Sequence, residues 1–327
     1  MRKSANRDAH VPVLLDQVLD VLSPKPGQII VDCTVGCGGH AAAILARLGP
    51  PELGGRLIGI DLDAGNLAIA RSRLERTRHR FDLFNTNFAG LPALLWQAGV
   101  KDGRADAVLA DIGVASTQID DPERGFSYRK PGPLDMRMDK TRGQPASVLV
   151  NSMTEADLAA AFLDLGDETD APHIARLIVE RRALEPITTT QQLMALVCEA
   201  RDFTIERGAG AKLHPAARTF QALRILVNRE LANLDRLLTV MPTVLVPGGI
   251  AAIITFHSGE DRRVKYAFRD GYRDGTYAFD KRDPLIATEE EREENPRARS
   301  AKLRWARMPG GEPRADAVPG HSIDDNS

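Results

Sequence analysis

One stretch near the amino terminus constrains the fold more than any other. Residues 29–32 favour a β-strand and end in an acid, and residues 36–39 contain three glycines in four positions. The helix-favouring run 41–46 follows at once. This order of strand, glycine turn and helix start is how α/β proteins bind a nucleotide-like cofactor, because glycines admit close approach and helix starts offer free N–H groups.

The loop alone leaves the identity of the ligand open. Gly36, Gly38 and Ala41 fit the dinucleotide pattern G-x-G-x-x-G/A, and the next apolar run ends at Asp61. An acid at this position can accept hydrogen bonds from the ribose hydroxyls of NAD or, equally, of S-adenosylmethionine. A tight turn that binds nothing is the third interpretation, and the ordered strand, loop, helix and acid argue against it.

Alternating strand and helix patterns continue as far as Asp111 and predict a parallel sheet. Phe88 follows the third strand, and Asp111 ends the fourth. The predicted strands are 29–32, 56–61, 81–86 and 105–111. The predicted helices between and before them are 12–22, 40–48, 66–78 and 91–98.

The alternation breaks after this point and resumes near the carboxyl terminus. Helical patterns at 155–165, 173–184 and 191–200 predict an inserted helical domain. A buried stripe predicts one long helix over 216–238, and an apolar strand follows at 250–256. The segments 277–286 and 301–307 suit a closing antiparallel pair. The predicted organisation is a sheet domain in two parts (1–119 and 214–308), a helical insertion (120–213) and a disordered tail (309–327).

Composition excludes several classes of protein. The chain has 43 basic and 45 acidic residues, so it has no overall attraction to nucleic acid, and any such contact must be local. Its three cysteines argue against a disulfide framework, and the spacing of Cys33, Cys37 and His40 gives no metal site. We find no signal sequence or run of about 20 apolar residues, and expect a cytoplasmic protein.

Several later stretches favour the methyl donor over NAD. A Pro-Gly-Gly turn at 247–249, a late strand and a terminal hairpin are similar to the class I methyltransferase layout. Over about residues 10–307, the chain resembles the RsmH (MraW) family of bacterial small-subunit rRNA methyltransferases. The resemblance rests on these stretches: Gly38-Gly39-His40, 111–118 (DIGVASTQ), 123–127 (ERGFS), 132–139 (GPLDMRMD), 214–224 (HPAARTFQALR), 256–262 (FHSGEDR) and 294–300 (ENPRARS).

This resemblance implies an α/β fold of the class I, S-adenosylmethionine-dependent methyltransferase type. That fold is Rossmann-like, with a mostly parallel sheet, an antiparallel end and here an inserted all-helical domain. The implied reaction is methylation of the exocyclic N4 of a cytidine in the decoding region of 16S rRNA, in the small ribosomal subunit. The implied cofactor-binding residues are Gly38, Gly39, His40, Asp61, Phe88, Asp111 and Gln118.

Asp111 and His257 are the catalytic candidates. A cytosine amine is a poor nucleophile because its lone pair is delocalised, so the enzyme must align it and accept its hydrogen bonds. Asp111 is placed for this and for receiving the proton that is lost, and cofactor binding alone is its competing role. His257, Ser258 and Glu260 are predicted to contact the target base at the same sheet edge.

The aromatic and basic candidates each have a structural interpretation beside the functional one. Phe126 and Tyr128 either stack on an unstacked target base or pack the insertion on the sheet, and Phe88 either stacks on adenine or packs in the core. One helix face is either solvated or binds phosphate through Arg218, Arg229 and Arg236. The candidates for rRNA phosphates are Arg137, Arg218, Arg224, Arg262, Arg297 and Arg299.

Two other classes of function stay open at this point. An NAD-dependent oxidoreductase is supported by the glycine loop and Asp61, but it lacks a hydride-transfer constellation. A non-catalytic RNA-binding factor for ribosome assembly would use the cofactor structurally. The oligomeric state is also open, with a homodimer as one option. The chain departs from the usual family pattern at Cys33, Cys37 and Gly259.

Overall fold

The structure, a computed structural model, describes residues 12–202 and 214–310. The disorder predicted for 309–327 lies almost wholly outside these residues. Within them, eight strands form one sheet in the order β3-β2-β1-β4-β5-β8-β6, and β7 also pairs with β8. The strands are β1 (Ile29–Asp32), β2 (Arg56–Asp61), β3 (Phe81–Asn85), β4 (Ala105–Asp111), β5 (Leu245–Thr255), β6 (Phe279–Asp280), β7 (Leu285–Ile286) and β8 (Lys302–Arg307).

The sheet is parallel from β1 to β5 and antiparallel at its far end, which confirms the predicted fold class. The predicted closing pair is present, but its first segment is not one strand. β6 and β7 each pair briefly with β8, and residues 281–284 separate them. This gap ends in Pro284, which has no N–H to donate to a ladder.

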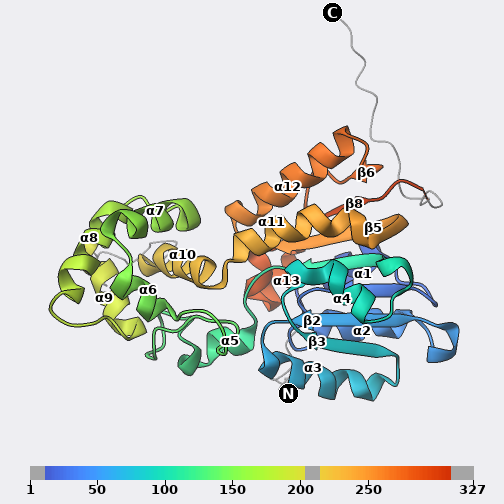
Figure 1. Ribbon diagram of the computed structural model, residues 1–327, viewed down its shortest axis with the longest axis horizontal. Coiled ribbons are helices and arrows are strands. Elements are labelled where there is room, and N and C mark those ends of the chain that lie inside the picture. The colour runs from blue at the N-terminus through green and yellow to red at the C-terminus, as the bar shows by residue number, and fades with distance from the viewer. Residues whose placement is uncertain (1–11, 203–213, 311–327) are drawn as a thin grey trace, which may run out of the picture.

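Helices cover both faces of the sheet (Figure 1). Buried side chains of α1, α2 and α3 pack on one face, and those of α4, α11 and α12 pack on the other. The α-helices are α1 (Leu15–Leu22), α2 (Gly39–Arg47), α3 (Ala64–Leu74), α4 (Leu91–Gln97), α5 (Ser116–Asp120), α6 (Ala146–Ser152), α7 (Glu155–Gly166), α8 (Ala171–Arg182), α9 (Thr190–Ala200), α10 (Ala216–Asn228), α11 (Glu230–Val240), α12 (Ser258–Arg273) and α13 (Glu289–Glu294).

A helical lobe stands beside the sheet lobe (Figure 1). It has a core of its own, formed by α6, α7, α8, α9 and the buried side of α10. Leu134 and Met136, from the segment between α5 and α6, also belong to this core. The chain therefore leaves the sheet after β4, builds a second hydrophobic core, and returns through α10 and α11.

The single helix predicted over 216–238 is wrong. Arg229 takes a left-handed backbone conformation (φ 52°), which ends α10 and starts α11 in a new direction. The apolar stripe is real, but its two halves serve different cores. Phe220 and Leu223 pack in the helical lobe, whereas Leu234 and Leu237 pack on the sheet. A straight helix cannot bury both halves when the two cores lie in different directions.

Candidate active site

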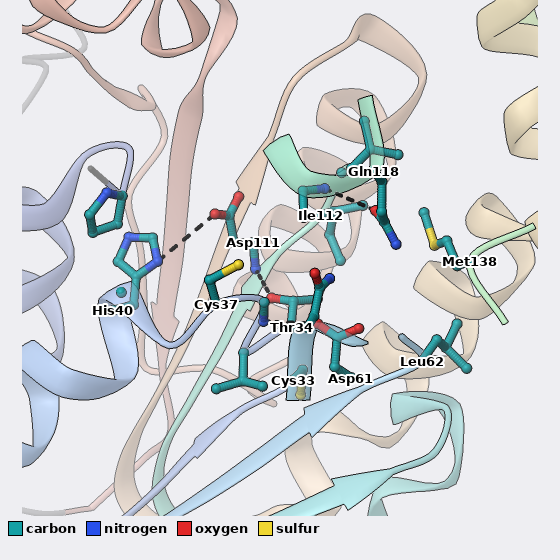
Figure 2. Close-up of a pocket in the computed structure, with 18 of the residues that line it drawn as sticks. Cys33, Thr34, Cys37, His40, Asp61, Leu62, Asp111, Ile112, Gln118 and Met138 are labelled. Carbon is teal, nitrogen blue, oxygen red and sulfur yellow. Dashed lines mark hydrogen bonds and ion pairs between the residues drawn. The ribbon is translucent and has the colours of Figure 1, made fainter. Parts of the chain in front are cut away.

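A cavity opens at the carboxyl ends of β1, β2 and β4 (Figure 2). It lies where the helical lobe joins the sheet, because residues from both lobes line it. Predicted cofactor residues on its wall are Gly39, His40, Asp61, Phe88, Asp111 and Gln118. Ligands of open α/β sheets bind at this edge, beyond the strand ends.

The glycine loop places Gly39 and Gly38 differently. Gly39 lines the cavity beside Pro12. Gly38 has φ 79° and precedes α2, and a Cβ atom built on it would lie 3.2 Å from the Cα of Ala70. Gly38 thus lets α2 start against α3. Its contribution to the cavity is the position of the loop rather than a lining atom.

Asp61 at the end of β2 is fixed by the backbone. Its Oδ2 accepts a hydrogen bond from the N–H of Gly36 (2.8 Å), and its Oδ1 accepts one from the N–H of Asp63 (2.7 Å). A side-chain hydrogen bond with Asn66 also acts on this carboxylate, and the side chain lines the cavity. Burial raises the pKa of Asp61 to about 6, because the charged form loses its hydration.

Asp111 points into the cavity from the end of β4 (Figure 2). Its backbone N–H donates to Thr34 Oγ1 (2.6 Å), and its Oδ1 has no hydrogen-bond partner among the described residues. Burial raises the pKa of Asp111 to about 7, and the charges of Asp32 and Glu260 add to the rise. Asp111 is therefore a carboxyl group poised to exchange a proton near neutral pH.

His40 stands beside Asp111 with its orientation fixed. Its Nε2 lies 2.9 Å from the carbonyl oxygen of Val13. A carbonyl only accepts, so this nitrogen carries a proton and donates it. The other nitrogen, Nδ1, faces Asp111 Oδ2 at 3.9 Å, as Figure 2 shows. His40 thus couples the first residues of the described chain to the cavity floor.

Asp32 lies beneath the floor and was not among the predicted site residues. It is 1% exposed, and its Oδ2 has no hydrogen-bond partner among the described residues. Burial raises its pKa to about 7, with a further rise from the charge of Asp61. Asp32, Asp61 and Asp111 together make a buried acidic group that could be recognised only after the strand ends were in register.

Comparisons with known proteins identify the family of the chain. The model of the MraW methylase family matches residues 7–308. The chain belongs to the MraW methylase family. Two similar curated proteins are both named ribosomal RNA small subunit methyltransferase H. The Heliobacterium modesticaldum protein is 43% identical, with 91% of this chain and 97% of the relative covered. The Symbiobacterium thermophilum protein is 44% identical, with 90% and 95% covered. A solved rRNA methylase from Streptococcus thermophilus aligns with a TM-score of 0.39 and 11% identity, over 92% of this chain and 99% of that one.

In this MraW-family chain, Gln118 reaches the cavity through a buried network. Its Oε1 accepts from the N–H of Ala115 (3.0 Å), and its Nε2 donates to Asp63 Oδ2 (3.0 Å). Asp63 also caps α3 by accepting from the backbone of Gly65 (2.9 Å). Its Oδ2 also accepts from Nη1 of Arg124 (2.6 Å). No separate sequence signal marks Asp63, which follows Asp61 by two residues.

Arg124 and Asn228 hold a loop of the helical lobe against the cavity. The Nη2 atom of Arg124 donates to the carbonyl oxygens of Arg137 (3.1 Å) and Met138 (2.9 Å). Asn228 accepts from the N–H of Met138 (2.8 Å) and donates to the carbonyl of Met136 (2.8 Å). Met138 lines the cavity, so this loop clamp joins a loop of the helical lobe to the wall of the cavity.

His257 and its neighbours hold the turn after β5. Glu260 is fully buried, and its Oε2 accepts from the N–H of Phe256 (2.9 Å). His257 Nε2 lies 3.0 Å from Glu260 Oε1 in an ion-pair geometry. Ser258 donates to Asp167 Oδ2 (3.0 Å), at the end of α7. The predicted contact of Glu260 with a target base is wrong, because its carboxylate is enclosed by the protein; Phe256 lines the cavity instead.

The aromatic pair lines a second pocket next to the first. Tyr128 stacks on His214 with ring centres 4.7 Å apart, and it meets the edge of Phe220 at 5.6 Å. Phe126 lies near the Arg124 guanidinium, at 5.8 Å. Val114 lines both pockets, so the aromatic rings stand beside the cavity. Both rings also pack on the helical core, as the structural interpretation predicted. Each ring also lines the second pocket, so a role in base stacking stays a prediction.

The predicted phosphate-binding arginines fall into two groups. Arg224 is paired through two hydrogen bonds with Glu230 (3.0 and 2.9 Å), and Arg137 is paired with Asp135 (2.8 and 2.9 Å). Each guanidinium is partly neutralised by its carboxylate, and the assignment of these two residues to phosphate stays a prediction. The exposed members of the set are Arg262, Arg297 and Arg299, and Arg297 also contacts Asp120 (3.4 Å). Arg218 donates one hydrogen bond to the carbonyl oxygen of Asp167 (2.9 Å).

Metal binding and membrane spanning find no support in the described ranges. No group of three metal-ligating side chains occurs among residues 12–202 and 214–310. Cys33 is buried, and burial raises the pKa of its thiol, as it does for Cys37. No helix in the same ranges has the length and apolar character needed to cross a bilayer.

Proposed function

We propose that the protein transfers a methyl group from S-adenosylmethionine to the exocyclic N4 of a cytidine in 16S rRNA. The observation that carries the proposal is the cavity with Asp111 on its floor, at the strand ends of a chain that belongs to a methylase family. The names of the relatives support the rRNA of the small ribosomal subunit as the partner, and the compartment that we propose is the cytoplasm. Family membership favours this function over an oxidoreductase or a non-catalytic factor.

The cavity fits S-adenosylmethionine in each of its parts. Asp61 lines the cavity with a carboxylate that can accept hydrogen bonds from the ribose hydroxyls. Phe88, with Leu62 and Ile112, offers apolar surface to the adenine. One buried oxygen of each carboxylate, Asp32 Oδ2 and Asp111 Oδ1, lacks a hydrogen-bond partner among the described residues. A cofactor with a positive sulfur and a positive amino group offsets this negative charge, which a neutral ligand would not do.

S-adenosylmethionine, when bound, supplies an electrophilic methyl group on its positively charged sulfur. The protein has to place the cytosine amine in line with that methyl group and keep water out. Asp111 is placed to accept a hydrogen bond from the amine and then the proton that the amine loses. His40, held by Val13, limits the directions in which the Asp111 carboxyl can turn. We place the reacting nitrogen at Asp111 for these reasons.

The target base must leave its stack to reach Asp111. The pocket beside the cavity, with Phe126 and Tyr128 on its wall, lies on the path from the helical lobe. We assign this pocket to an unstacked base, because unstacked bases stack on aromatic side chains. Arg218, Arg297 and Arg299 are the rim cations that suit adjacent phosphates. His257 then acts by holding the turn that carries Phe256.

The cofactor assignment is tested by calorimetric titration with S-adenosylmethionine and, in parallel, with NAD. We expect binding of S-adenosylmethionine alone. Asp61→Ala should weaken it about 100-fold, because two charge-assisted hydrogen bonds are lost. Asp82→Ala is a matched control, since Asp82 is a half-exposed carboxylate that pairs with Arg56 on β2. Binding of NAD alone would refute the proposal.

The reaction is tested with small ribosomal subunits that lack the modification. The protein and methyl-labelled S-adenosylmethionine are incubated with these subunits, and the rRNA is digested to nucleosides. We expect label in N4-methylcytidine by mass spectrometry. Label in a ring carbon or a ribose would contradict the assigned nitrogen, and label in no nucleoside would point to a non-catalytic role.

A further inference from the structure

The outward face of α12 is a charged surface that the proposed function leaves unused. The helix buries Glu260, Val264, Phe268 and Gly271 against the sheet lobe. At about 100° per residue, the side chains opposite these form a stripe with two flanking positions. The stripe and its flanks, called here the α12 face, are Arg262, Tyr266, Arg269, Arg273, Lys265, Tyr272 and one acid, Asp270.

The α12 face is strongly positive, although the whole chain has a net charge of −2. Arg262 and Lys265 are exposed, and no described residue forms an ion pair with them. Arg269 and Arg273 share the carboxylate of Asp270, at 2.7 and 3.7 Å. Asp261 on the same helix is occupied by Arg304 and Lys302. The cations of the α12 face are therefore only partly neutralised.

Two large aromatic rings lie among these cations. Tyr266 is 46% exposed and Tyr272 is 48% exposed. The guanidinium of Arg269 lies over the ring of Tyr266, at 4.6 Å from its centre. An exposed ring next to a cation is the arrangement that binds single-stranded nucleic acid, because the ring stacks on a base while the cation meets a phosphate.

The position of the α12 face suits a strand that enters the cavity. Phe256, which lines the cavity, precedes α12 by two residues, and Ser258 bonds to Asp167 of the helical lobe. Figure 1 shows α12 running outward from the junction of the two lobes. From Arg262 to Arg273 the stripe is about 16 Å long, at 1.5 Å per residue.

We propose that the α12 face binds the RNA strand that flanks the target nucleotide. The phosphates of that strand contact Arg262, Lys265 and Arg269, and one of its bases stacks on Tyr266. This inference rests on the proposed function, because it takes rRNA as the substrate. It adds a second RNA-binding surface, outside the cavity and on the opposite lobe from the aromatic pocket.

Two other occupants fit the same face less well. An anionic membrane also attracts basic helices, but such helices insert an apolar side, and that side of α12 is buried in the core. A second copy of the chain, paired by a two-fold axis, would bring this positive face against itself. RNA satisfies both the charge and the exposed rings.

The test measures binding of the full-length protein to in vitro transcribed 16S rRNA over a range of salt concentrations. In Arg262→Ala/Lys265→Ala we expect about tenfold weaker binding, and a salt slope smaller by about two, since two phosphate contacts are lost. Arg71→Ala/Arg76→Ala is the matched control, because it removes two exposed cations near α3. Tyr266→Ala should weaken binding at least fivefold, and Tyr266→Phe should retain it.

Equal loss in the two double variants would overturn the inference, since it would show a general charge effect. Unchanged binding in the α12 variants would do the same. If sedimentation instead shows that these variants change the oligomeric state while RNA binding stays constant, the face binds a second copy. Calorimetry with S-adenosylmethionine separates the two proposals. If the wild type binds the cofactor and methylates rRNA while the α12 variants bind rRNA as the wild type does, only the proposal for the α12 face is refuted.

Discussion

Buried carboxylates have different surroundings in the two lobes. In the helical lobe, Glu168 is fully buried and pairs with Arg201 at 3.2 Å, and Arg201 also pairs with Asp170 at 3.1 Å. In the sheet lobe, no described lysine or arginine pairs with Asp32, Asp61 or Asp111. The helical lobe thus neutralises this buried charge internally, whereas these three carboxylates at the cavity have no cation beside them.

The difference shows where the protein accepts an energetic cost. A buried carboxylate without a cation is unfavourable, and the raised pKa values at the cavity express that cost. A cationic ligand removes it on binding. The buried carboxylate of the helical lobe is already paired with an arginine, so it serves packing and hydrogen bonding. Substitutions in the two lobes should therefore have different consequences.

The largest expected effect comes from Asp111→Asn. The amide keeps the shape of the side chain but cannot take the proton, so we expect methyl transfer to fall about 100-fold or more. Binding of S-adenosylmethionine should change by less than about fivefold. Single-turnover methyl transfer and calorimetry measure the two effects. If affinity falls in parallel with turnover, Asp111 is a cofactor ligand only. Glu168→Gln, in the other lobe, should leave both quantities unchanged.

Next in size is the effect of loosening the loop clamp that joins the lobes. In Arg124→Lys, the single ammonium group can keep Asp63 but cannot also reach the carbonyl groups of Arg137 and Met138. We expect about tenfold lower turnover, with a raised KM for rRNA and little change in the affinity for S-adenosylmethionine.

Arg56→Lys is the matched control for the loop clamp. Arg56 is also buried and also joins a carboxylate to a carbonyl, those of Asp82 (2.6 Å) and Ala98 (2.8 Å), but it lies away from the cavity. Both variants should lose similar thermal stability. Equal turnover in the two variants would reduce Arg124 to a structural role.

The sequence predicted the sheet well because its signals are local. Each parallel strand is a short apolar run that ends in a turn, and Asp61 and Asp111 are the last residues of such runs. The break at Arg229 was not predictable in this way, because the stripe of apolar residues continues through it. What changes there is the core that the stripe meets, and this depends on the fold of the whole chain.

Long-range partners explain the other omissions. Residues 262–276, where α12 continues, carry no predicted structure, because the many charges there obscure the apolar positions Val264 and Phe268. Arg124 and Asn228 form hydrogen bonds with the loop at Met138, and no local sequence pattern predicts such pairs. Glu260 followed a predicted strand end, as Asp111 does, but its side chain turned inward to hold its own turn.

The pH dependence of kcat/KM should reveal the unpaired carboxylates of the sheet lobe. Burial raises the pKa of Asp111 to about 7, so at pH 6 most molecules carry a protonated carboxyl that cannot accept the amine proton. We expect kcat/KM to rise about tenfold from pH 6 to pH 8 and then to level off. The residual activity of Asp111→Asn should lack this rise. A wild-type profile that is flat or falls over this range would contradict the assignment.

The smallest effect separates the two lobes by its sign. At pH 8, Asp32→Asn should raise the free energy of unfolding by about 1 kcal/mol, because a buried charge without a cation is removed. Glu168→Gln should lower it by about 1 kcal/mol, because Arg201 loses a charged partner. Urea unfolding without cofactor measures both. Since burial raises the pKa of Asp32 to about 7 in the folded protein, the wild type gains stability as pH falls through 7, and the advantage of Asp32→Asn should vanish near pH 4. Destabilisation by both variants at pH 8 would show that Asp32 is as well accommodated as Glu168, and the contrast between the lobes would fail.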